Sequence, residues 1–488
     1  MPHQTRRDFL RESAIIAAAS AALAGEAIAE PKYLPTPKKV GANDKLRVAV
    51  LGFNGQGLSH IKAYAALPDT EVAIVCDCDA NLAGKGIKAA EAIQKTAPTF
   101  EQDLRKVMED KSIDIVSIAM PNHWHALAAI WAVQHGKDVY VEKPVSHNVF
   151  EGRRLVEIAR AHNRIVQTGT QSRSNSGMRQ AIEYLHSGKL GPIKVAKGLC
   201  YKFRPSIGPK GEGSVPKSVD YDLWCGPAPL KPPQRTRFHY DWHWFWDYGN
   251  GDLGNQGIHE MDKARWGLGL KGLCQRVISF GGRLGYTDAG ETANTQVSCF
   301  DYGDAHIIFE VRGLVTSDPM GKNRGKNFVG NIWYGSEGTM VSSSYDAAVV
   351  LDVNNQEVTR FKGGGNHHAN FIKAVRSRKQ EDLHADIEEG HLSSALCHLA
   401  NISYRLGTQH ALAGLNFDSP FSCLNNEVVR LAEHLKDNKM EVNADLRIHL
   451  GANLAFDATH EQFIGAKEAN ILLSREYRKG FEVPGRSA

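Results

Sequence analysis

Apolar runs and helical stretches alternate in a regular order between residues 45 and 170. The apolar runs are rich in Val, Ile and Leu, and stretches of three or four helical turns separate them. Strands that read as continuous apolar runs are buried on both faces, which is typical of parallel sheets with helices on each side. Predicted strands are 46–52, 71–76, 113–120, 138–143 and 164–170, and predicted helices are 57–67, 80–95, 125–136 and 148–162. The pattern therefore predicts an α/β domain with a doubly wound parallel sheet.

The turn between the first predicted strand and helix is rich in glycine. Its sequence, Gly-Phe-Asn-Gly-Gln-Gly at 52–57, fits the spacing G-x-G-x-x-G except that Asn54 replaces the middle glycine. Asn is the non-glycine residue that best tolerates positive φ, so we expect the tight turn to persist. Amides at the start of the following helix would hold the phosphates of a dinucleotide. The residues predicted to contact it are Gly52, Asn54, Gly55, Gln56 and Gly57.

An acidic residue follows the second predicted strand. Asp77 lies twenty residues after Gly57, where a carboxylate binds the adenosine ribose hydroxyls and repels a 2′-phosphate. We therefore expect a Rossmann domain at 45–170 that binds NAD, with NADP disfavoured. The alternative is an acidic loop, formed by Asp77 and Asp79, that binds no ligand.

The pattern changes after about residue 170 to longer stretches with period-two character. Turn signals such as Gly281-Gly282 and Ser336-Glu337-Gly338 lie between or after several of them, and helices are predicted at 177–187, 369–378 and 391–406. This predicts an α+β domain at 171–414 with a largely antiparallel sheet. The tail at 415–488 is expected to be irregular and to dock back.

The N-terminus resembles an export leader. Arg6 and Arg7 precede a modest apolar stretch, and a small-residue cleavage site ends at Ala29. We expect a twin-arginine signal peptide at 1–29, a linker at 30–44, and a periplasmic or secreted protein that is exported folded and has no membrane anchor after cleavage. A frayed helix with a chance arginine pair is the alternative. Because the periplasm has no appreciable pool of free dinucleotide, an exported protein would have to carry its cofactor already bound.

Composition disfavours several other classes of protein. The net charge of +4 comes without a basic stripe, so no nucleic-acid partner is expected. The eight cysteines form no CxxC pair, which disfavours a disulfide framework. Pairs of histidines such as His367 and His368 raise the possibility of a metal, but no HExxH or carboxylate triad accompanies them, so no catalytic metal is predicted.

The segment Glu142-Lys143-Pro144 ends another predicted strand, at the edge of the sheet where ligands of open parallel sheets bind. A lysine at this place can act as general acid and base toward a hydroxyl if its pKa is lowered by burial or by a neighbouring charge. A solvated lysine at a strand end is the alternative interpretation.

Taken together, these motifs resemble those of the Gfo/Idh/MocA family, which includes glucose-fructose oxidoreductase and inositol 2-dehydrogenase. The resemblance covers about residues 45–410 and also rests on the segments 121–125, 136–144 and 188–191. It implies an open-faced sheet in the second domain and a sugar or cyclitol bound between the domains. It also implies contacts of the cofactor with Pro121, Asn122, His125, Glu142 and Lys143.

The resemblance also implies catalytic roles for three residues. Lys143 would contact the reacting hydroxyl. A second family motif places Asp and His four residues apart on a helix, and here His259 matches the histidine while Asn255 replaces the aspartate. Since Asn cannot ionise, the usual Asp–His pairing is weakened.

An aromatic segment lies upstream, at 239–248. Flat ring faces beside carboxylates suit a carbohydrate, so His243 and Trp244 are predicted to contact substrate together with His259. Core or dimer-interface roles remain open for the same rings. Arg173, after the last strand of the first domain, is expected to border the same cleft.

These observations predict an enzyme that transfers hydride between a sugar carbon and a tightly bound, internally recycled nicotinamide cofactor. The alternative is an NAD-dependent glycoside hydrolase or lyase that uses transient oxidation, elimination and re-reduction. A third hypothesis is a non-catalytic sugar sensor that keeps nucleotide for structure. A homo-oligomer is expected because an exposed sheet face invites pairing.

Overall fold

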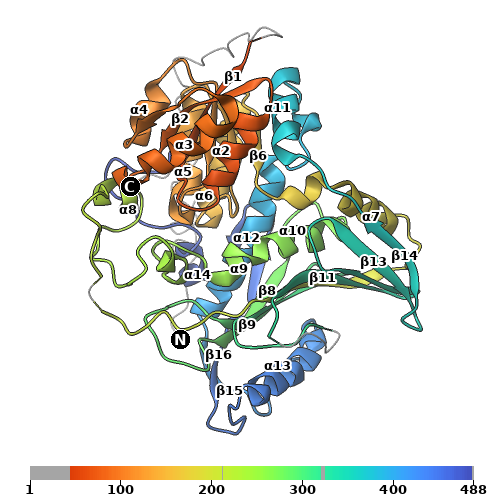
Figure 1. Ribbon diagram of the computed structural model, residues 1–488. Helices are drawn as coiled ribbons and strands as arrows, with labels where there is room; N and C mark the ends of the chain where they lie inside the picture. The colour runs from red at the N-terminus through yellow and green to blue at the C-terminus, as the bar shows by residue number, and fades with distance from the viewer. Residues whose placement is uncertain (1–43, 212, 320–324, 486–488) are drawn as a thin grey trace, which may run out of the picture.

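The computed structural model describes residues 44–211, 213–319 and 325–485. The expected signal peptide and the linker as far as residue 43 lie outside the described residues. Within the described part of the chain, no helix is long and apolar enough to cross a membrane. Figure 1 shows two layered regions, with the first sheet and its helices above and the larger sheet below.

The first region is a six-stranded sheet in the order β3-β2-β1-β4-β5-β6, and every neighbouring pair of strands is parallel. This confirms the predicted doubly wound sheet. The order reverses between β1 and β4, which opens a crevice at the carboxyl ends of these strands. The strands are β1 (Leu46–Leu51), β2 (Thr70–Cys76), β3 (Thr99–Glu101), β4 (Ile115–Ile118), β5 (Asp138–Val141) and β6 (Val166–Thr168).

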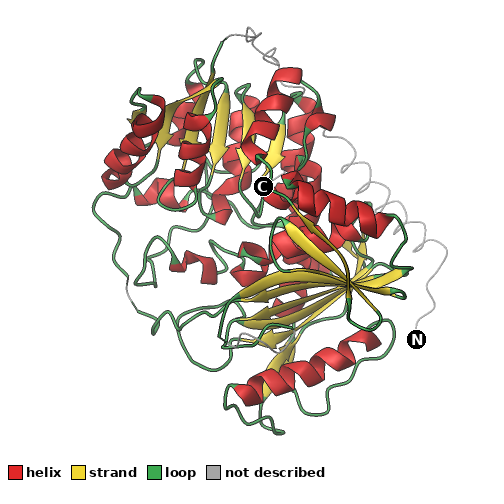
Figure 2. Ribbon diagram, turned by 45° about the vertical axis from the view of Figure 1, so that its right-hand side comes forward, coloured by secondary structure: helices red, strands yellow, loops and turns green. Residues whose placement is uncertain are grey.

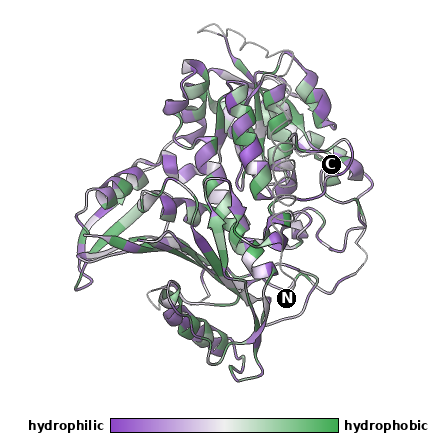
Figure 3. Cartoon of the chain, turned by 180° about the vertical axis from the view of Figure 1, so that it is seen from behind, coloured by the Kyte–Doolittle hydropathy of each residue, from purple (hydrophilic) through white to green (hydrophobic). Residues whose placement is uncertain are grey.

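Helices cover both faces of this sheet. One apolar core lies under α2, α3 and α11, and a second lies under α4, α5 and α6. Figure 3 shows hydrophobic and hydrophilic residues alternating along these helices, as expected when one face of a helix is buried. The helices are α2 (Gly57–Ala66), α3 (Ala83–Gln94), α4 (Leu104–Glu109), α5 (Asn122–Gln134), α6 (Val149–Ala161) and α11 (His367–Ser377).

Several helices begin at a side chain that caps their free amides. Asn148 accepts a hydrogen bond from the Glu151 amide at the start of α6, and Asp103 accepts one from the Arg105 amide at the start of α4. In contrast, no side chain caps α2, and its first turn holds no acidic residue. The amides at the start of α2 are therefore not satisfied by a side-chain cap.

The second region is built on a twelve-stranded sheet with the main order β14-β13-β12-β11-β7-β10-β9-β8-β16-β15. Its neighbouring strands are antiparallel except for β7 and β10, so the predicted, largely antiparallel sheet is confirmed. The helices α7 (Ser176–His186), α10 (Gly257–Gly267) and α12 (Ile387–Arg405) pack on its inner face. The strands are β7 (Ile193–Tyr201), β8 (Arg276–Gly282), β9 (Thr295–Asp301), β10 (His306–Arg312), β11 (Phe328–Gly335), β12 (Gly338–Ser342), β13 (Ala347–Asp352), β14 (Glu357–Lys362), β15 (Thr408–Ala411) and β16 (Arg447–Leu450).

The C-terminal tail is more regular than expected. It contributes β16, β17 (Leu454–Asp457), β18 (Gln462–Phe463), and the helices α13 (Asn425–Asp437) and α14 (Lys467–Ile471). The expectation of an irregular tail is wrong because β16 pairs with β8 and β15, and so extends the second sheet. Farther on, the tail reaches the first region, where Phe481 packs 5.7 Å from Trp124 between ring centroids.

The helix α13 lies on the outer face of the second sheet, opposite α10 and α12 (Figure 2). Leu431 and Leu435 of this helix pack against Phe280 on β8 and Val297 on β9. Lys197 on β7 also pairs with Glu427 on the helix. The outer face is therefore covered over β7–β10, while Tyr334 on β11 remains exposed.

A long connection joins β7 to the short helix α9 (Gly251–Asn255) and leaves the second sheet to lie beside the first region. It contains α8 (Tyr221–Cys225) and a 3₁₀ turn at Asp241–Trp244. Buried aromatic residues give it a small core of its own, which includes Trp224, Phe238 and Tyr248.

Candidate active site

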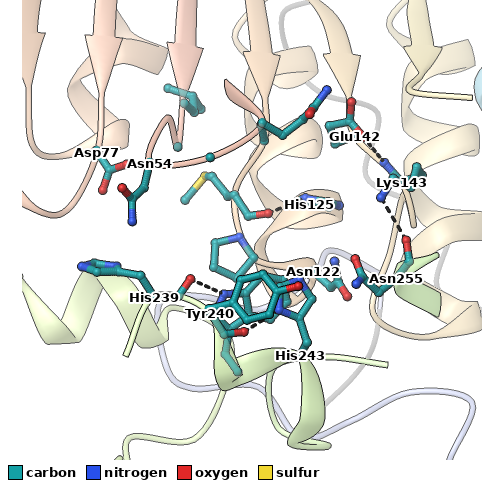
Figure 4. A pocket seen from close by; sticks show the side chains of 18 of the residues that line it. Asn54, Asp77, Asn122, His125, Glu142, Lys143, His239, Tyr240, His243 and Asn255 are labelled. Atoms are coloured by element: carbon teal, nitrogen blue, oxygen red, sulfur yellow. Dashed lines mark hydrogen bonds between the residues drawn. The ribbon is translucent and has the colours of Figure 1, made fainter. Parts of the chain in front are cut away.

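A cavity of about 620 Å³ lies at the carboxyl ends of β1, β2, β4 and β5. Residues of both regions line it, as Figure 4 shows. Those among the predicted site residues are Gly52, Asn54, Gly55, Gln56, Asp77, Pro121, Asn122, His125, Glu142, Lys143, His243, Asn255 and His259.

The glycine turn is shaped by two close backbone approaches. Gly52 has a φ of +73°, and a Cβ there would lie 2.9 Å from the Ala119 carbonyl oxygen. A Cβ on Gly57 would lie 2.0 Å from the carbonyl oxygen of Gly52. Gly57 does not line the cavity, so it serves the turn by allowing the start of α2 to approach β1. The uncapped amides of α2 lie directly after this turn.

Asn54 differs from the sequence-based expectation. It is not among the non-glycine residues with positive φ, so the idea that it replaces a glycine through a left-handed conformation is wrong. The side chain is exposed, and the backbone oxygen of Asn54 accepts a hydrogen bond from Lys85 Nζ at 2.7 Å. The turn tolerates Asn54 because the left-handed position is taken by Gly52 instead.

Asp77 is half-buried at the end of β2, on the wall of the cavity. One carboxylate oxygen accepts from the Phe53 amide at 3.0 Å and the other from the Asp79 amide at 3.1 Å. Burial raises the pKa of this carboxyl, although both backbone hydrogen bonds oppose the rise. Two fixed amides orient the carboxylate, and each oxygen keeps a further lone pair for a hydroxyl.

Glu142 is held in a buried hydrogen-bond network behind the cavity. Its Oε1 accepts from His60 Nε2 at 3.2 Å and from Gln171 Nε2 at 3.2 Å. Burial opposes ionisation of this carboxyl, but the hydrogen bond and charge of His60, together with the nearby Lys143, lower its pKa well below the usual range. Glu142 therefore places a fixed negative charge beside Lys143.

His125 connects two loops of the cavity. Its Nδ1 lies 2.6 Å from the Pro144 carbonyl oxygen, and its Nε2 lies 2.6 Å from the Met120 carbonyl oxygen. Burial lowers the pKa of His125 despite these two contacts. The ring thus ties the end of β5, where Lys143 lies, to the loop after β4.

Lys143 points into the cavity, and its Nζ donates to the backbone oxygen of Asn255 at 2.9 Å. Burial lowers the pKa of this amine, and Lys202 adds to the effect, although Glu142 opposes it. A lowered pKa gives the amine a larger neutral fraction near neutral pH, which is what a general base requires.

The Asn255–His259 pair does not lie on one continuous helix. The helix α9 ends at Asn255 and α10 begins at Gly257, with Gln256 between them. Both side chains still line the cavity, and Asn255 acts through its backbone oxygen on Lys143. The two residues are therefore not on one helix, as the motif implies, but the break between α9 and α10 still leaves both of them at the cavity.

His259 is buried, and its ring lies 4.8 Å from that of Tyr345 between centroids. Burial lowers the pKa of His259 well below its usual value, and the nearby Lys143 lowers it further. Its Nδ1 has no hydrogen-bond partner among the described residues. His259 therefore combines a lowered pKa with a buried, unpaired Nδ1, and it lines the same cavity as Lys143.

Two predicted substrate residues do not reach the cavity. Arg173 is buried and pairs with Asp262 at 2.8 Å and with Glu389 at 3.0 Å, so its charge is used within the second region. Trp244 is buried in the small core of the β7–α9 connection, where the Arg204 guanidinium lies 5.1 Å from its ring. Of the aromatic segment, His243 does line the cavity, and burial lowers its pKa to about 3.

Sequence reasoning missed several residues of the cavity. Gln256 donates from Nε2 to the Tyr345 hydroxyl at 2.9 Å, and both residues face the space near His259. His239, Tyr240 and Trp242 also line the cavity. For these three residues, the many aromatic residues in 239–248 are a sequence signal for a place at the cavity. No motif near Tyr345 indicates that this residue reaches the cavity. No group of three or more potential metal ligands occurs among the residues that the structure describes.

Comparison with known families agrees with this geometry. Residues 46–170 match the model of the oxidoreductase family, NAD-binding Rossmann fold, and residues 184–441 match the model of its C-terminal alpha/beta domain. The chain belongs to the Gfo/Idh/MocA oxidoreductase family. Its first region is thus an NAD-binding domain, and the expectation of NAD is confirmed.

Curated relatives of this Gfo/Idh/MocA protein include sugar and cyclitol dehydrogenases. A levoglucosan dehydrogenase of Pseudarthrobacter phenanthrenivorans is 25% identical over 187 residues, which cover 34% of this chain and 47% of that protein. An inositol 2-dehydrogenase of Salmonella typhimurium is 27% identical over 158 residues, or 32% and 46% of the two chains. A glycosyl hydrolase family 109 protein of Shewanella sp. (strain ANA-3) is 29% identical over 167 residues, or 32% and 36%. The matches span less than half the length of these relatives.

Solved structures show the same fold. The WlbA dehydrogenase of Bordetella pertussis, in complex with NADH and UDP-GlcNAcA, aligns with a TM-score of 0.53 and 21% identity over 72% of this chain and 94% of that chain. A levoglucosan dehydrogenase in complex with NADH and levoglucosan aligns with a TM-score of 0.55 and 18% identity over 72% and 95%. At these identities the likeness concerns the fold alone.

Proposed function

We propose that this protein oxidises and reduces a CH–OH group of a sugar, glycoside or cyclitol with bound NAD. The observation that carries the proposal is the meeting of two kinds of residue in one cavity. The glycine turn and Asp77 lie along one part of it, and the Lys143 amine and the His259 imidazole face the rest. A dinucleotide site that opens onto two proton-handling groups suits redox chemistry at a hydroxyl.

The residues around the glycine turn fit NAD. The Leu58 and Ser59 amides already donate to the carbonyls of Gly55 and Gln56, so the pyrophosphate would lie against the turn itself at Gly55 and Gln56. Gly55 has open space where a Cβ would be. The oriented carboxylate of Asp77 would accept from the ribose hydroxyls, and its charge would disfavour a 2′-phosphate. The loop that contains Pro121 and Asn122 lines the cavity farther along the strand ends.

Lys143 and His259 would share the handling of the hydroxyl proton. Bound NAD would supply the hydride chemistry at the carbon that carries the hydroxyl. Lys143, held by the Asn255 carbonyl, accepts the proton of the hydroxyl at Nζ as its neutral amine. His259 lines the same part of the cavity and would contact the hydroxyl, which orients the substrate. The negative charge of Glu142 stabilises the ammonium that results.

A second function remains open because several relatives are glycosyl hydrolase family 109 proteins. In this function, a CH–OH group of a glycoside would be oxidised transiently in the same cavity. The neighbouring carbon would then lose a proton as the aglycone is eliminated, water would add to the resulting double bond, and the carbonyl would be reduced again. The sum of these steps is hydrolysis without net change of the cofactor. We favour net redox chemistry because the dehydrogenase relatives span a wider range of sugars and cyclitols.

We also propose that the protein is exported in the folded state with NAD already bound. The arginine pair near the N-terminus supports this, together with the small-residue site at Ala27-Ile28-Ala29. Each reduction of the cofactor would then have to be reversed within the site, either by a second substrate or by the same one.

One experiment tests both chemistries. The mature protein is purified and denatured, the released nucleotide is identified, and the intact protein is mixed with free sugars or with aryl glycosides. Net redox chemistry predicts that a free sugar changes the near-ultraviolet absorbance of the reduced nicotinamide. Aglycone release without such a change would select the hydrolytic function. A protein that neither contains nor takes up NAD or NADP would overturn the proposal.

A further inference from the structure

The cavity has a second wall that lies outside the Rossmann domain. Residues 219–249 of the β7–α9 connection, which we term the cover segment, run along the side opposite the glycine turn. Their cavity-lining members are Leu223, Trp224, His239, Tyr240, Trp242 and His243. In Figure 4, His239 lies on the side of Asn54 and Asp77, whereas His243 lies toward Asn122 and Asn255.

The cover segment is bound at the adenosine end of the cavity, beyond the end of β2. Val219 forms an isolated bridge with Asp79, and the Asp220 amide donates to the Cys78 carbonyl at 2.9 Å. From farther along the segment, His239 Nε2 contacts Asp79 Oδ2 at 3.0 Å. Asp79 lies two residues after Asp77, so this contact lies beside the carboxylate that would hold the ribose.

A second set of contacts binds the cover segment to the start of α5. Trp124 donates from Nε1 to the Leu223 carbonyl at 2.9 Å, and His123 Nε2 lies 2.9 Å from the Trp224 carbonyl. The tail adds an ion pair between Arg478 and Asp222. The segment is thus anchored to the loop after β2 and to the start of α5, which border the two parts of the nucleotide crevice.

The cover segment is also packed internally. The Arg235 guanidinium lies 4.3 Å from the Trp224 ring, 4.5 Å from the Phe238 ring and 5.2 Å from the Tyr248 ring. Trp244 belongs to the same buried cluster. Tilted and edge-to-face aromatic rings packed around a cation hold the backbone in one arrangement, so the segment can act as a wall of the cavity.

We propose that the cover segment is part of the NAD site and slows the release of bound NAD, with the His239–Asp79 contact fastening it at the adenosine end. The inference rests on the proposed function, because it assumes that NAD occupies this cavity. A ligand that contacts two walls anchored to each other must break its contacts with both to leave, and movement of the second wall would ease that step. The barrier to that movement adds to the barrier for dissociation and so lowers the rate of release.

The test measures release of NAD from the purified protein. The protein is loaded with NAD and mixed with an enzyme that consumes free NAD, and the decay of bound nucleotide is followed. The His239→Ala variant is expected to release NAD about 10-fold faster, equivalent to about 1.4 kcal/mol. His239→Gln keeps a donor at the same place and is expected to release NAD at nearly the native rate.

A matched control exists at the surface. His460 Nδ1 contacts Asp457 Oδ2 at 2.7 Å, and neither residue lines the cavity. The His460→Ala variant is expected to release NAD at the native rate. If His239→Ala does not fold, Asp79→Asn tests the same contact, because it removes the negative charge of the other partner. In the native protein, Asp79 Oδ1 accepts a hydrogen bond from the Asn81 amide, and the amide oxygen of Asn can accept it as well.

The outcomes separate the two proposals. If the native protein holds NAD and both His239→Ala and Asp79→Asn release it at the native rate, the role of the cover segment is wrong and the proposed function stands. If the native protein binds no NAD, both proposals are wrong. Faster release in His460→Ala, equal to that in His239→Ala, would also overturn the role of the cover segment, because the effect would not belong to the cavity.

Discussion

The two walls of the cavity are built in different ways. The Rossmann wall is a set of strand ends and one tight turn, and its shape follows from short-range backbone geometry such as the 2.0 Å approach that only glycine allows at position 57. The cover segment has little regular structure, and it is placed by contacts between residues far apart in the chain, such as His239 and Asp79, which are 160 residues apart. Under the two proposals, the first wall would select the cofactor and the second would set how fast that cofactor is released.

The largest effect on turnover is expected at Lys143, which lines the cavity between the two walls. Lys143→Ala should lower turnover roughly 10²- to 10⁴-fold, about 3–5 kcal/mol of activation free energy, because the proposed proton acceptor is lost. NAD should remain bound. Lys143→Arg is the matched variant, since it keeps the charge but cannot act as a base at neutral pH. Steady-state rates for both variants check this, and an active Lys143→Arg enzyme would show that charge alone suffices.

A large effect on stability, without one on substrate binding, is expected from Arg173. Its removal would leave the buried Asp262 with only the longer ion pair to Arg265, at 4.0 Å, and should lower the free energy of unfolding by up to about 3–5 kcal/mol. Denaturant unfolding of Arg173→Ala measures the change. Because Arg173 lies outside the cavity, KM for the sugar should stay at the native value. An increase in KM without loss of stability would return Arg173 to the substrate site.

An intermediate effect is expected for the Rossmann wall at Asp77. Asp77→Ala removes charged hydrogen-bond acceptors for the ribose, so NAD should bind about 10- to 100-fold more weakly. Discrimination against NADP should decrease as well, because the negative charge is gone. Equilibrium titration with both dinucleotides tests this. An unchanged preference would mean that the ribose is held elsewhere.

The effect that is smallest at neutral pH, and that grows on acidification, concerns the junction of the two walls at His123. Burial lowers the pKa of this ring from 6.5 to about 3. The unfolded state therefore binds a proton that the folded state does not, so stability is complete above about pH 6.5 and decreases as the pH falls toward about 3. This ring alone should contribute up to about 1.4 kcal/mol per pH unit within that range.

His123→Gln removes the titrating group and keeps a donor for the Trp224 carbonyl. Its free energy of unfolding should fall less steeply with acidification than that of the native protein, as measured by denaturant unfolding at several pH values. Equal slopes for the two proteins would show that burial does not lower the pKa of His123.

Much of the Rossmann domain can be predicted from the sequence because its signals are local. Apolar runs of five or more residues and the glycine spacing mark the strands and the turn, and Lys143 follows from its place at a strand end. The strand β3, only three residues long, has no such signal and was missed. In the turn, Gly52 and not Asn54 has the left-handed conformation. The reason is that the Ala119 backbone lies close to Gly52, and the sequence does not reveal this contact.

The rest of the site depends on contacts that local patterns do not encode. Arg173 was assigned to the cleft because it follows the last Rossmann strand, but its carboxylate partners lie 89 and 216 residues away. Trp244 and His243 are neighbours in an aromatic segment, and only packing separates the core residue from the cavity residue. Tyr345 reaches the cavity through the second sheet and has no motif of its own.

The helix α13 has a consequence for any shortened form of the chain. Phe280 and Val297 are almost completely buried beneath it, on strands whose other face is already packed. A truncation before residue 425 would leave these side chains as a bare hydrophobic surface, and such surfaces drive proteins to aggregate. Expression of soluble material therefore calls for boundaries that retain the whole tail, even though the proposed catalytic residues end well before it.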